Sequence, residues 1–301
     1  MGALSASAAC LLDGGTGIAQ AAPRRCVVTS FSILADMARQ AGSGAVDVIG
    51  LVPPDADVHV YQPRPADMKA VAAADVLVEN GLGLEGWLAR LAGASGFKGT
   101  RIAAAAGVSP RAMREGGGAM TDDPHAWQDP RNGVIYVRNI RDGLIAADPA
   151  GAADYRANAA AFITEIERVD AWITAQFATI PAADRRIITS HDAFGYYGAR
   201  YGIALLAPQG MSTDAEPSAK AIAALVAQIK QERVRAVFIE SMTDPRMAKM
   251  IARESGAVLG GTVYSDSLSP VGGPAATYLT MLRHNTALFV RAMGGAVAPR
   301  G

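Results

Sequence analysis

The stretch AGAADYRANAAAFITEIERVDAWITAQF, residues 150–177, carries the longest helical pattern of the chain and lies near its middle. Its apolar residues recur every three or four positions, which is typical of a helix that buries one face. At about 1.5 Å per residue, such a helix would span about 40 Å, enough to cross a whole domain. Pro181 follows and ends the pattern. The apolar stripe consists of Tyr155, Phe162, Ile166, Val169 and Ile173.

On both sides of this helix, short β-rich runs alternate with helical patterns, which is typical of parallel, layered α/β domains. The expected strands are 26–30, 46–52, 76–78, 101–105, 186–189, 236–239 and 258–264. The sequence therefore predicts an α/β fold with two parallel-sheet lobes joined by one long, rigid helix. We expect a signal-like or flexible N-terminus over 1–24, a first lobe over 25–147, the linking helix over 148–180 and a second lobe over 181–301.

The other helical patterns cover 33–41, 68–74, 85–92, 129–147, 192–201, 218–232, 247–255 and 274–293. Asp67 is the expected N-cap of the second of these, and Ser218 the expected N-cap of the sixth. Residues 107–122 are rich in glycine and polar residues, and we interpret them as a mobile loop.

The composition argues against a nucleic-acid partner and against a membrane span. The chain has 301 residues with 28 basic and 28 acidic side chains, so its net charge is zero. A nucleic-acid-binding protein would usually present a basic face, so no nucleic-acid partner is expected. No run of about 18 apolar residues is present, and we expect no membrane span.

The N-terminus has the small and apolar residues of a secretory signal. Ala19-Gln20-Ala21 resembles a small-x-small cleavage site, but the positively charged start of a signal is missing. Either the true start lies upstream of Met1, or the segment is a flexible tail, and we favour the first explanation. An extracytoplasmic protein is the resulting prediction.

The chain contains two cysteines, Cys10 and Cys26. Ser7 occupies the position where a lipobox prefers leucine, so we do not expect a lipid anchor on Cys10. Cleavage after Ala21 would leave Cys26 alone, without a partner for a disulfide, and we expect it to be a buried strand cysteine.

Three of the four histidines lie where side chains can converge. His59 and His125 are in polar, proline-containing loops, and His191 follows an apolar strand, as Asp266 also does. Ligands of open α/β sheets bind beyond the carboxyl ends of the strands, so the four groups can meet between the lobes. Three imidazoles and one carboxylate form a complete tetrahedral set for Zn²⁺. His284 lies within the last helical pattern and is interpreted as structural.

Each carboxylate near this set has an alternative role. Asp266 could cap a turn through the neighbouring serines. Glu240 ends a strand and could be a ligand, an acceptor for an imidazole N–H, or a turn residue; we prefer the acceptor, because metal-bound histidines usually donate their other nitrogen to such a group. Asp123 and Asp192 are further candidates for this supporting role.

Four ordered motifs carry a resemblance to a known family. They resemble those of the zinc/manganese solute-binding proteins of bacterial metal ABC transporters (the cluster A-I type), and the resemblance extends from about Cys26 to the last helix. It implies two α/β lobes bridged by one long helix, with the metal between them. Carried over by motif, the family's ligands fall on His59, His125, His191 and Asp266. The motifs are DVHVYQPRPAD (57–67), DPHAWQDPRN (123–132), SHDAFGYY (190–197) and YSDSLS (264–269).

The resemblance also bears on the metal. Many zinc-specific members have a long histidine-rich loop before the second motif, whereas residues 107–122 contain no histidine. This loop is therefore not expected to collect metal. Manganese importers tend to have Glu at the third ligand position, where this chain has His191. Imidazole suits zinc and Mn²⁺ prefers oxygen donors, so we favour zinc, with manganese or a mixed Mn/Zn/Fe specificity as the alternative.

The predicted function is high-affinity capture of the ion outside the cytoplasm and its delivery for import, without enzymatic chemistry. The resemblance implies a periplasmic or lipid-anchored location and an integral-membrane ABC permease as partner. A metallochaperone is a further candidate partner, and we expect a monomer. A zinc hydrolase is the rival class; it would need Asp266 off the metal and Glu240 as general base. An adhesin-type surface protein is compatible with the same fold.

Overall fold

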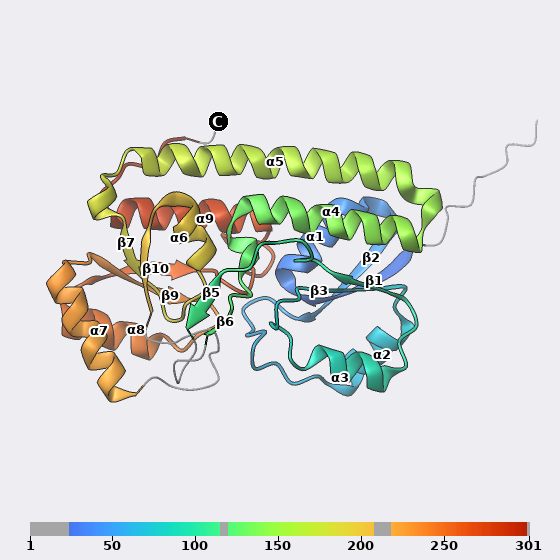
Figure 1. Cartoon of the computed structure of the whole chain (residues 1–301), viewed down its shortest axis with the longest axis horizontal. Helices are drawn as coiled ribbons and strands as arrows, with labels where there is room; N and C mark the ends of the chain where they lie inside the picture. The colour runs from blue at the N-terminus through green and yellow to red at the C-terminus, as the bar shows by residue number, and fades with distance from the viewer. Residues whose placement is uncertain (1–23, 115–119, 208–217, 300–301) are drawn as a thin grey trace, which may run out of the picture.

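The computed structural model describes residues 24–114, 120–207 and 218–299. Two α/β lobes lie next to each other along the long axis, and the helix α5 (Ala152–Ala178) extends over both of them (Figure 1). The predicted fold class, two parallel-sheet α/β lobes joined by one long helix, is confirmed.

Each lobe is built on a four-stranded parallel sheet. The first sheet has the strand order β2-β1-β3-β4, and the second has the order β10-β9-β7-β8. The strands of the first lobe are β1 (Arg25–Phe31), β2 (Val46–Val52), β3 (Val76–Glu79) and β4 (Thr100–Ala103). Those of the second lobe are β7 (Arg186–Ile188), β8 (Ala204–Leu206), β9 (Ala236–Glu240) and β10 (Val258–Val263).

Helices cover both faces of each sheet, as the burial of parallel strands requires. In Figure 1, α1 (Ser32–Gly42) and α4 (Pro130–Ala147) lie above the first sheet, and α2 (Pro65–Ala73) and α3 (Leu88–Ser95) lie below it. In the second lobe, α6 (Gly195–Tyr201) and α9 (Tyr278–Ala292) lie above, with α7 (Ala219–Glu232) and α8 (Pro245–Ser255) below. Short 3₁₀ helices occupy Ser43–Ala45, Ala126–Gln128, Pro149–Gly151 and Ala182–Asp184.

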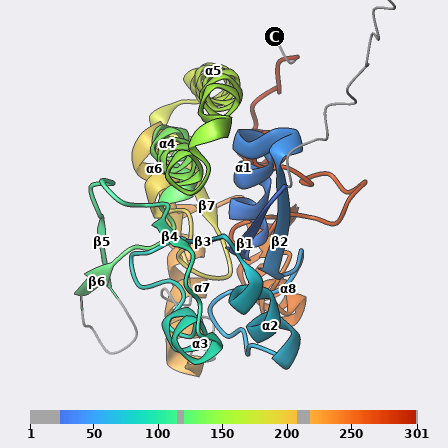
Figure 2. The same ribbon diagram turned by 90° about the vertical axis from the view of Figure 1, so that its right-hand side faces the viewer.

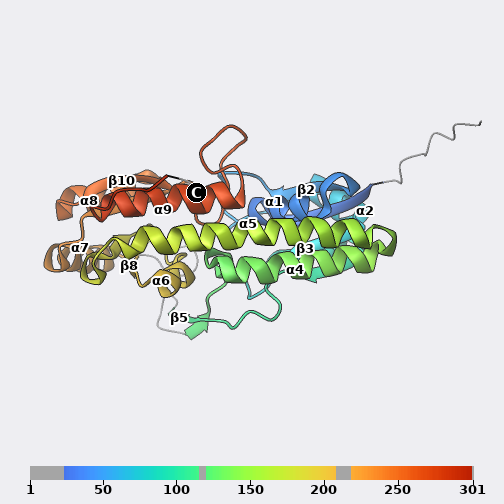
Figure 3. The same ribbon diagram turned by 90° about the horizontal axis from the view of Figure 1, so that it is seen from above.

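The long helix α5 joins the lobes through a continuous core. It contacts α1 and α4 of the first lobe and α9 of the second, and runs alongside α4 and α9 when seen from above (Figure 3). Every residue of the predicted apolar stripe is buried, from Tyr155 at one end to Ile173 at the other, and Phe177 extends it. Because one rigid element packs on both lobes, large changes in their relative position would expose this stripe to water.

The loop predicted over 107–122 contains two short strands among its described residues. Its ends form an antiparallel pair, β5 (Ala112–Arg114) and β6 (Met120–Asp122). In the view along the long axis, this hairpin projects from one side of the molecule (Figure 2). Strand β8 was also missing from the prediction.

The predicted starts of several helices were wrong. Helix α2 begins at Pro65, and Asp67 is its third residue, where its carboxylate accepts from the backbone N–H of Arg64. Helix α3 begins at Leu88, because the Glu85 side chain turns inward to accept from the backbone N–H of Asn80.

Two later helices also begin beyond their predicted starts. Helix α6 begins at Gly195 and not at Asp192, because the carbonyl of His191 closes a turn by accepting from Ala193 N. Helix α9 begins at Tyr278, after Thr277 as N-cap. Ser218 is the N-cap of α7, as predicted: its hydroxyl accepts from Ala221 N.

Cys26 is only partly buried and not fully buried as predicted, because it lies near the start of β1, at the rim of the sheet. Within the described ranges, none of the helices combines the length and the apolar character that crossing a bilayer requires.

Candidate metal centre

The structure brings the four predicted ligands together between the lobes. His59 comes from the loop after β2, and His125 follows β6 in the first lobe. His191 follows β7, and Asp266 follows β10 in the second lobe. One ligand atom from each of the four residues can be chosen so that all lie within 4.8 Å of one another. The two lobes therefore contribute equally to one cluster.

Local turns present the two loop histidines. The carboxylate of Asp57 accepts from the backbone N–H of His59 at 2.8 Å, and Asp123 accepts from that of His125 at 3.0 Å. An aspartate that bonds to the backbone two residues later forms an Asx turn. The repeated Asp-x-His pattern is thus the local reason why both rings leave the chain in a defined direction.

The spacing of the donor atoms fits a tetrahedral ion. The Nε2 atoms of His59 and His191 each lie 3.0 Å from Oδ2 of Asp266. The Nε2 atom of His125 lies 3.3 Å from Nε2 of His59 and 3.7 Å from Oδ1 of Asp266. Donors about 2 Å from a tetrahedral zinc ion are about 3.3 Å apart. Small shifts of the side chains would therefore accommodate the ion.

Burial makes this cluster chemically unusual. His125, His191 and Asp266 are fully buried, and the side chain of His59 is 4% exposed. Among the described residues, Oδ1 of Asp266 has no hydrogen-bond partner, although it is buried. A buried carboxylate oxygen without a partner is costly, and a bound cation would satisfy it.

The charges of the cluster stabilise one another. Burial by itself would lower the pKa of His191, but the carboxylates of Glu240 and Asp266 raise this pKa well above its ordinary value. Burial would raise the pKa of Asp266, but His191 and His125 hold it well below its ordinary value. In the metal-free protein the carboxylates therefore favour the protonated form of His191, and the imidazoles favour the ionised form of Asp266.

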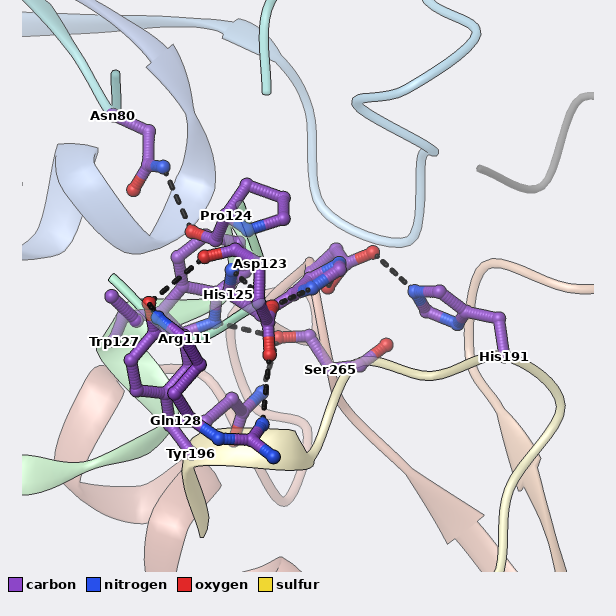
Figure 4. A network of polar contacts seen from close by, with 12 residues as sticks. Asn80, Arg111, Asp123, Pro124, His125, Trp127, Gln128, His191, Tyr196 and Ser265 are labelled. Atoms are coloured by element: carbon purple, nitrogen blue, oxygen red, sulfur yellow. Dashed lines mark hydrogen bonds and ion pairs between the residues drawn. The ribbon is translucent and has the colours of Figure 1, made fainter. Parts of the chain in front are cut away.

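Two of the three predicted supporting carboxylates contact the outer nitrogens of the imidazoles. Asp123 Oδ1 lies 2.8 Å from Nδ1 of His125 (Figure 4), and Glu240 Oε2 lies 2.7 Å from Nδ1 of His191. Glu240 also accepts from the backbone N–H of His191 at 2.8 Å. Such contacts orient the ring so that Nε2 faces the ion.

Asp192, the third candidate, does not have this position. Within the described part of the chain, it makes no hydrogen bond to an imidazole of the cluster. Burial and the nearby Asp123 carboxylate raise its pKa. The structure therefore gives no support to a role for Asp192 in orienting a ligand.

Several residues that hold Asp266 in place were not predicted. The carbonyl of Ser265 accepts from Nε1 of Trp127 at 2.9 Å and from Nε2 of Gln128 at 2.7 Å. The backbone N–H of Leu268 donates to the hydroxyl of Ser32 at 2.9 Å. These bonds fasten the Asp266 segment of the second lobe to the first lobe. Nothing in the sequence marks them, because each joins residues more than 130 positions apart.

His284 lies away from the cluster. Its Nε2 atom is 2.9 Å from the carbonyl oxygen of Thr262, and its ring contacts Tyr264. This contact between α9 and β10 agrees with the structural role expected for it.

Comparison with known sequences identifies the family. A sequence profile described as the periplasmic component A of the zinc-uptake complex matches residues 27–292. A manganese-binding lipoprotein of Halalkalibacterium halodurans is 36% identical over 268 residues, which cover 88% of this chain and 87% of the relative. An iron-binding protein of Yersinia pestis is 32% identical, with coverage of 89% and 86%.

Solved structures show the same fold. The periplasmic zinc-binding protein of Treponema pallidum superposes with a TM-score of 0.84 at 27% identity, covering 90% of this chain and 99% of that one. The manganese-bound periplasmic metal-binding protein of Candidatus Liberibacter asiaticus gives a TM-score of 0.81 at 29% identity, covering 90% and 100%.

These similarities extend over almost the whole chain and settle the class of protein. Members of this family are extracytoplasmic substrate-binding proteins, not enzymes, so the alternative of a zinc hydrolase is excluded. Such proteins work with the membrane permease and the ATPase of an ABC transporter. The chain is a metal-binding protein of ABC transporters and belongs to the family of the periplasmic zinc-uptake component A.

Proposed function

We propose that this protein captures Zn²⁺ outside the cytoplasm and delivers it to an ABC permease for import. The observation that carries the proposal is the buried cluster of three imidazoles and one carboxylate, His59, His125, His191 and Asp266. With one carboxylate against a divalent ion, the loaded cluster has a net charge of about +1. The nearby carboxylates of Asp123 and Glu240 offset this charge.

The nature of the donors favours zinc over manganese. Imidazole nitrogen suits Zn²⁺, whereas Mn²⁺ prefers carboxylate, carbonyl and water oxygens. Among the residues that the structure describes, Asp266 is the one member of the cluster that offers oxygen, and Glu240 faces the outer nitrogen of His191. Relatives named manganese-binding and iron-binding make these two metals the competing cargoes. Mn²⁺ would need a further oxygen ligand, and the second carboxylate oxygen of Asp266 is the group that would supply it.

The location and partners follow the family. We propose that the protein is a periplasmic monomer whose partner is an integral-membrane permease. A metallochaperone that loads the site is a further candidate partner. Several relatives are named lipoproteins, which opposes our expectation that Cys10 carries no lipid anchor. Cys10 itself lies outside the described residues.

Metal competition tests the proposal. The protein, purified without chelator and then stripped, is titrated with Zn²⁺, Mn²⁺ and Fe²⁺ against a chelating indicator. One zinc per chain, with Mn²⁺ a poor competitor, is the expected result. Tight Mn²⁺ binding would replace zinc with manganese as the cargo, and a protein that binds none of the three ions tightly would refute metal capture altogether.

Zinc affinity is expected to fall about tenfold for each pH unit below neutrality. The pKa of His191 in the metal-free protein is raised well above its ordinary value by Glu240 and Asp266. The raised pKa favours the protonated ring, so protons compete with zinc for His191, and this competition grows stronger as the pH falls. Above the pKa of His191 this dependence disappears.

The measurement is the dissociation constant for Zn²⁺ at pH 6, 7 and 8, with the chelator's own pH dependence subtracted. Calorimetry in buffers of different ionisation enthalpy counts the protons released. A zinc affinity that stays constant from pH 8 to pH 6 would contradict the prediction.

A further inference from the structure

We infer that Arg111 is a positioning residue for the metal ligand His125, acting through Asp123 and anchored across the lobes by Tyr196. The inference rests on the proposed metal site. It assigns a role to the base of the β5–β6 hairpin, where the sequence suggested only a mobile loop.

The two oxygens of Asp123 have different partners. Oδ1 accepts from the backbone N–H of His125 and lies 2.8 Å from Nδ1 of its ring. Oδ2 accepts from Nη1 of Arg111 at 3.1 Å (Figure 4). The Asp123 side chain is only 1% exposed, and the Arg111 side chain 39%. Arg111 thus reaches from the surface to the far side of the carboxylate that orients His125.

Tyr196 anchors this pair to the second lobe. Its hydroxyl accepts from the backbone N–H of Arg111 at 3.0 Å and donates to the carbonyl of Asp123 at 3.0 Å. The guanidinium carbon of Arg111 lies 5.6 Å from the centre of the Tyr196 ring, a distance at which cation–π attraction operates. Tyr196 belongs to α6, whereas Arg111 and Asp123 flank the hairpin. The orientation of His125 is therefore tied to both lobes.

A glycine provides the space for the guanidinium group. A Cβ atom added to Gly195 would overlap Nη1 of Arg111 and would lie 2.7 Å from Oδ2 of Asp123. A side chain at the first residue of α6 would therefore push the guanidinium group of Arg111 away from its present position beside Asp123. The close packing at Gly195 is a separate observation from the hydrogen bonds, and it points to the same contact between Arg111 and Asp123.

The physical consequence concerns the direction of the His125 ring. A carboxylate bound at both oxygens cannot rotate. Oδ1 of Asp123 therefore stays in contact with Nδ1 of His125, and Nε2 of the same ring stays directed at the ion. Without Arg111, Oδ2 loses its charged partner and the carboxylate can turn. Asn80 holds the same segment from the other side, since its Nδ2 donates to the carbonyl of Pro124 at 2.9 Å. The backbone therefore stays in place, and the loss is confined to the side chains.

The test compares Arg111→Ala with Arg141→Ala. Arg141 forms an ion pair with the exposed Asp142 on α4, so its removal controls for the loss of one arginine–carboxylate contact. We expect Arg111→Ala to weaken zinc binding by about tenfold to a hundredfold, the usual effect of losing a group that orients a ligand, and Arg141→Ala to leave it unchanged. Added guanidinium ion at millimolar concentration should restore affinity to Arg111→Ala, whereas sodium at the same ionic strength should not.

Two further measurements separate positioning from a general loss of structure. Gly195→Ala keeps Arg111 but displaces its guanidinium group, and should weaken zinc binding in the same direction. In the metal-free protein, the NMR signals of the His125 ring nitrogens should change in Arg111→Ala and remain unchanged in Arg141→Ala.

The possible failures are distinguishable. If the unaltered protein binds no zinc, the proposed function fails, while the His125 signals of the metal-free variants still decide the role of Arg111. If Arg111→Ala binds zinc as tightly as the unaltered protein and leaves these signals unchanged, the inference is overturned. A loss of affinity that guanidinium does not restore, with unchanged His125 signals, would also overturn it.

Discussion

Replacing His59 with alanine is expected to weaken zinc binding by roughly a hundredfold or more while the protein stays folded. Four-ligand zinc sites bind with about 10–16 kcal/mol in total, so one ligand contributes roughly 3 kcal/mol. His59 is the cleanest ligand to remove. Its Nε2 atom contacts Asp266 and His125, which both belong to the cluster. The dissociation constant for Zn²⁺, measured by competition with a chelator, checks the prediction.

His284→Ala is the matched control, because it removes the remaining histidine, whose ring contacts Thr262 and Tyr264 and not the cluster. Its zinc affinity should equal that of the unaltered protein. Equal affinity in the His59 variant would instead remove His59 from the site.

Alanine at the other two histidines is a less clean experiment. Removing His191 leaves the buried carboxylate of Glu240 without the ring that it faces, and removing His125 does the same to Asp123. A buried charge left without its partner destabilises a fold strongly. Both variants should therefore lose stability as well as affinity, which denaturant titration of the metal-free proteins would show.

Glu85→Gln is expected to become more stable relative to the unaltered protein as the pH rises. The free energy of unfolding of the variant, minus that of the unaltered protein, should be about 3 kcal/mol larger at pH 8 than at pH 4.5. Burial raises the pKa of Glu85 to about 7 from an ordinary value of 4.5, against the hydrogen bonds from Ser30 and Asn80 that lower it. The folded state therefore holds the proton more tightly than the unfolded state. The stability that this proton contributes is present below about pH 4.5 and is lost as the pH rises through 7.

Glutamine cannot ionise, and its side-chain oxygen can still accept from the Ser30 hydroxyl and the Asn80 N–H, at the 2.6 and 2.7 Å seen for Glu85. The measurement is the free energy of unfolding in urea for both proteins between pH 4.5 and 8. Glu167→Gln removes a carboxylate from the exposed face of α5 and corrects for the change in total charge. A difference between Glu85→Gln and the unaltered protein that stays constant with pH would contradict the prediction.

Regular elements could be predicted from the sequence, whereas several of their ends could not. The apolar stripe of α5 and the runs that became β1, β2, β3 and β9 show their period within a few residues. The starts of α3 and α6 depended on where Glu85 and the carbonyl of His191 found partners, and these partners come from tertiary packing or tight turns.

The candidate metal ligands could be predicted from the sequence, whereas the groups around them could not. The sequence by itself determined the alternation that makes two parallel-sheet lobes, and it singled out His59, His125, His191 and Asp266 as one donor set. Their chemistry, and their position after strands and in Asp-x-His turns, are properties of short segments. Only the tertiary structure decided that Arg111, Tyr196 and Gly195 meet around Asp123, and that Trp127, Gln128 and Ser32 hold the Asp266 segment. Apart from the contact between Arg111 and Asp123, these contacts join residues that are distant in the chain and belong to different lobes, so they form only when the lobes pack together.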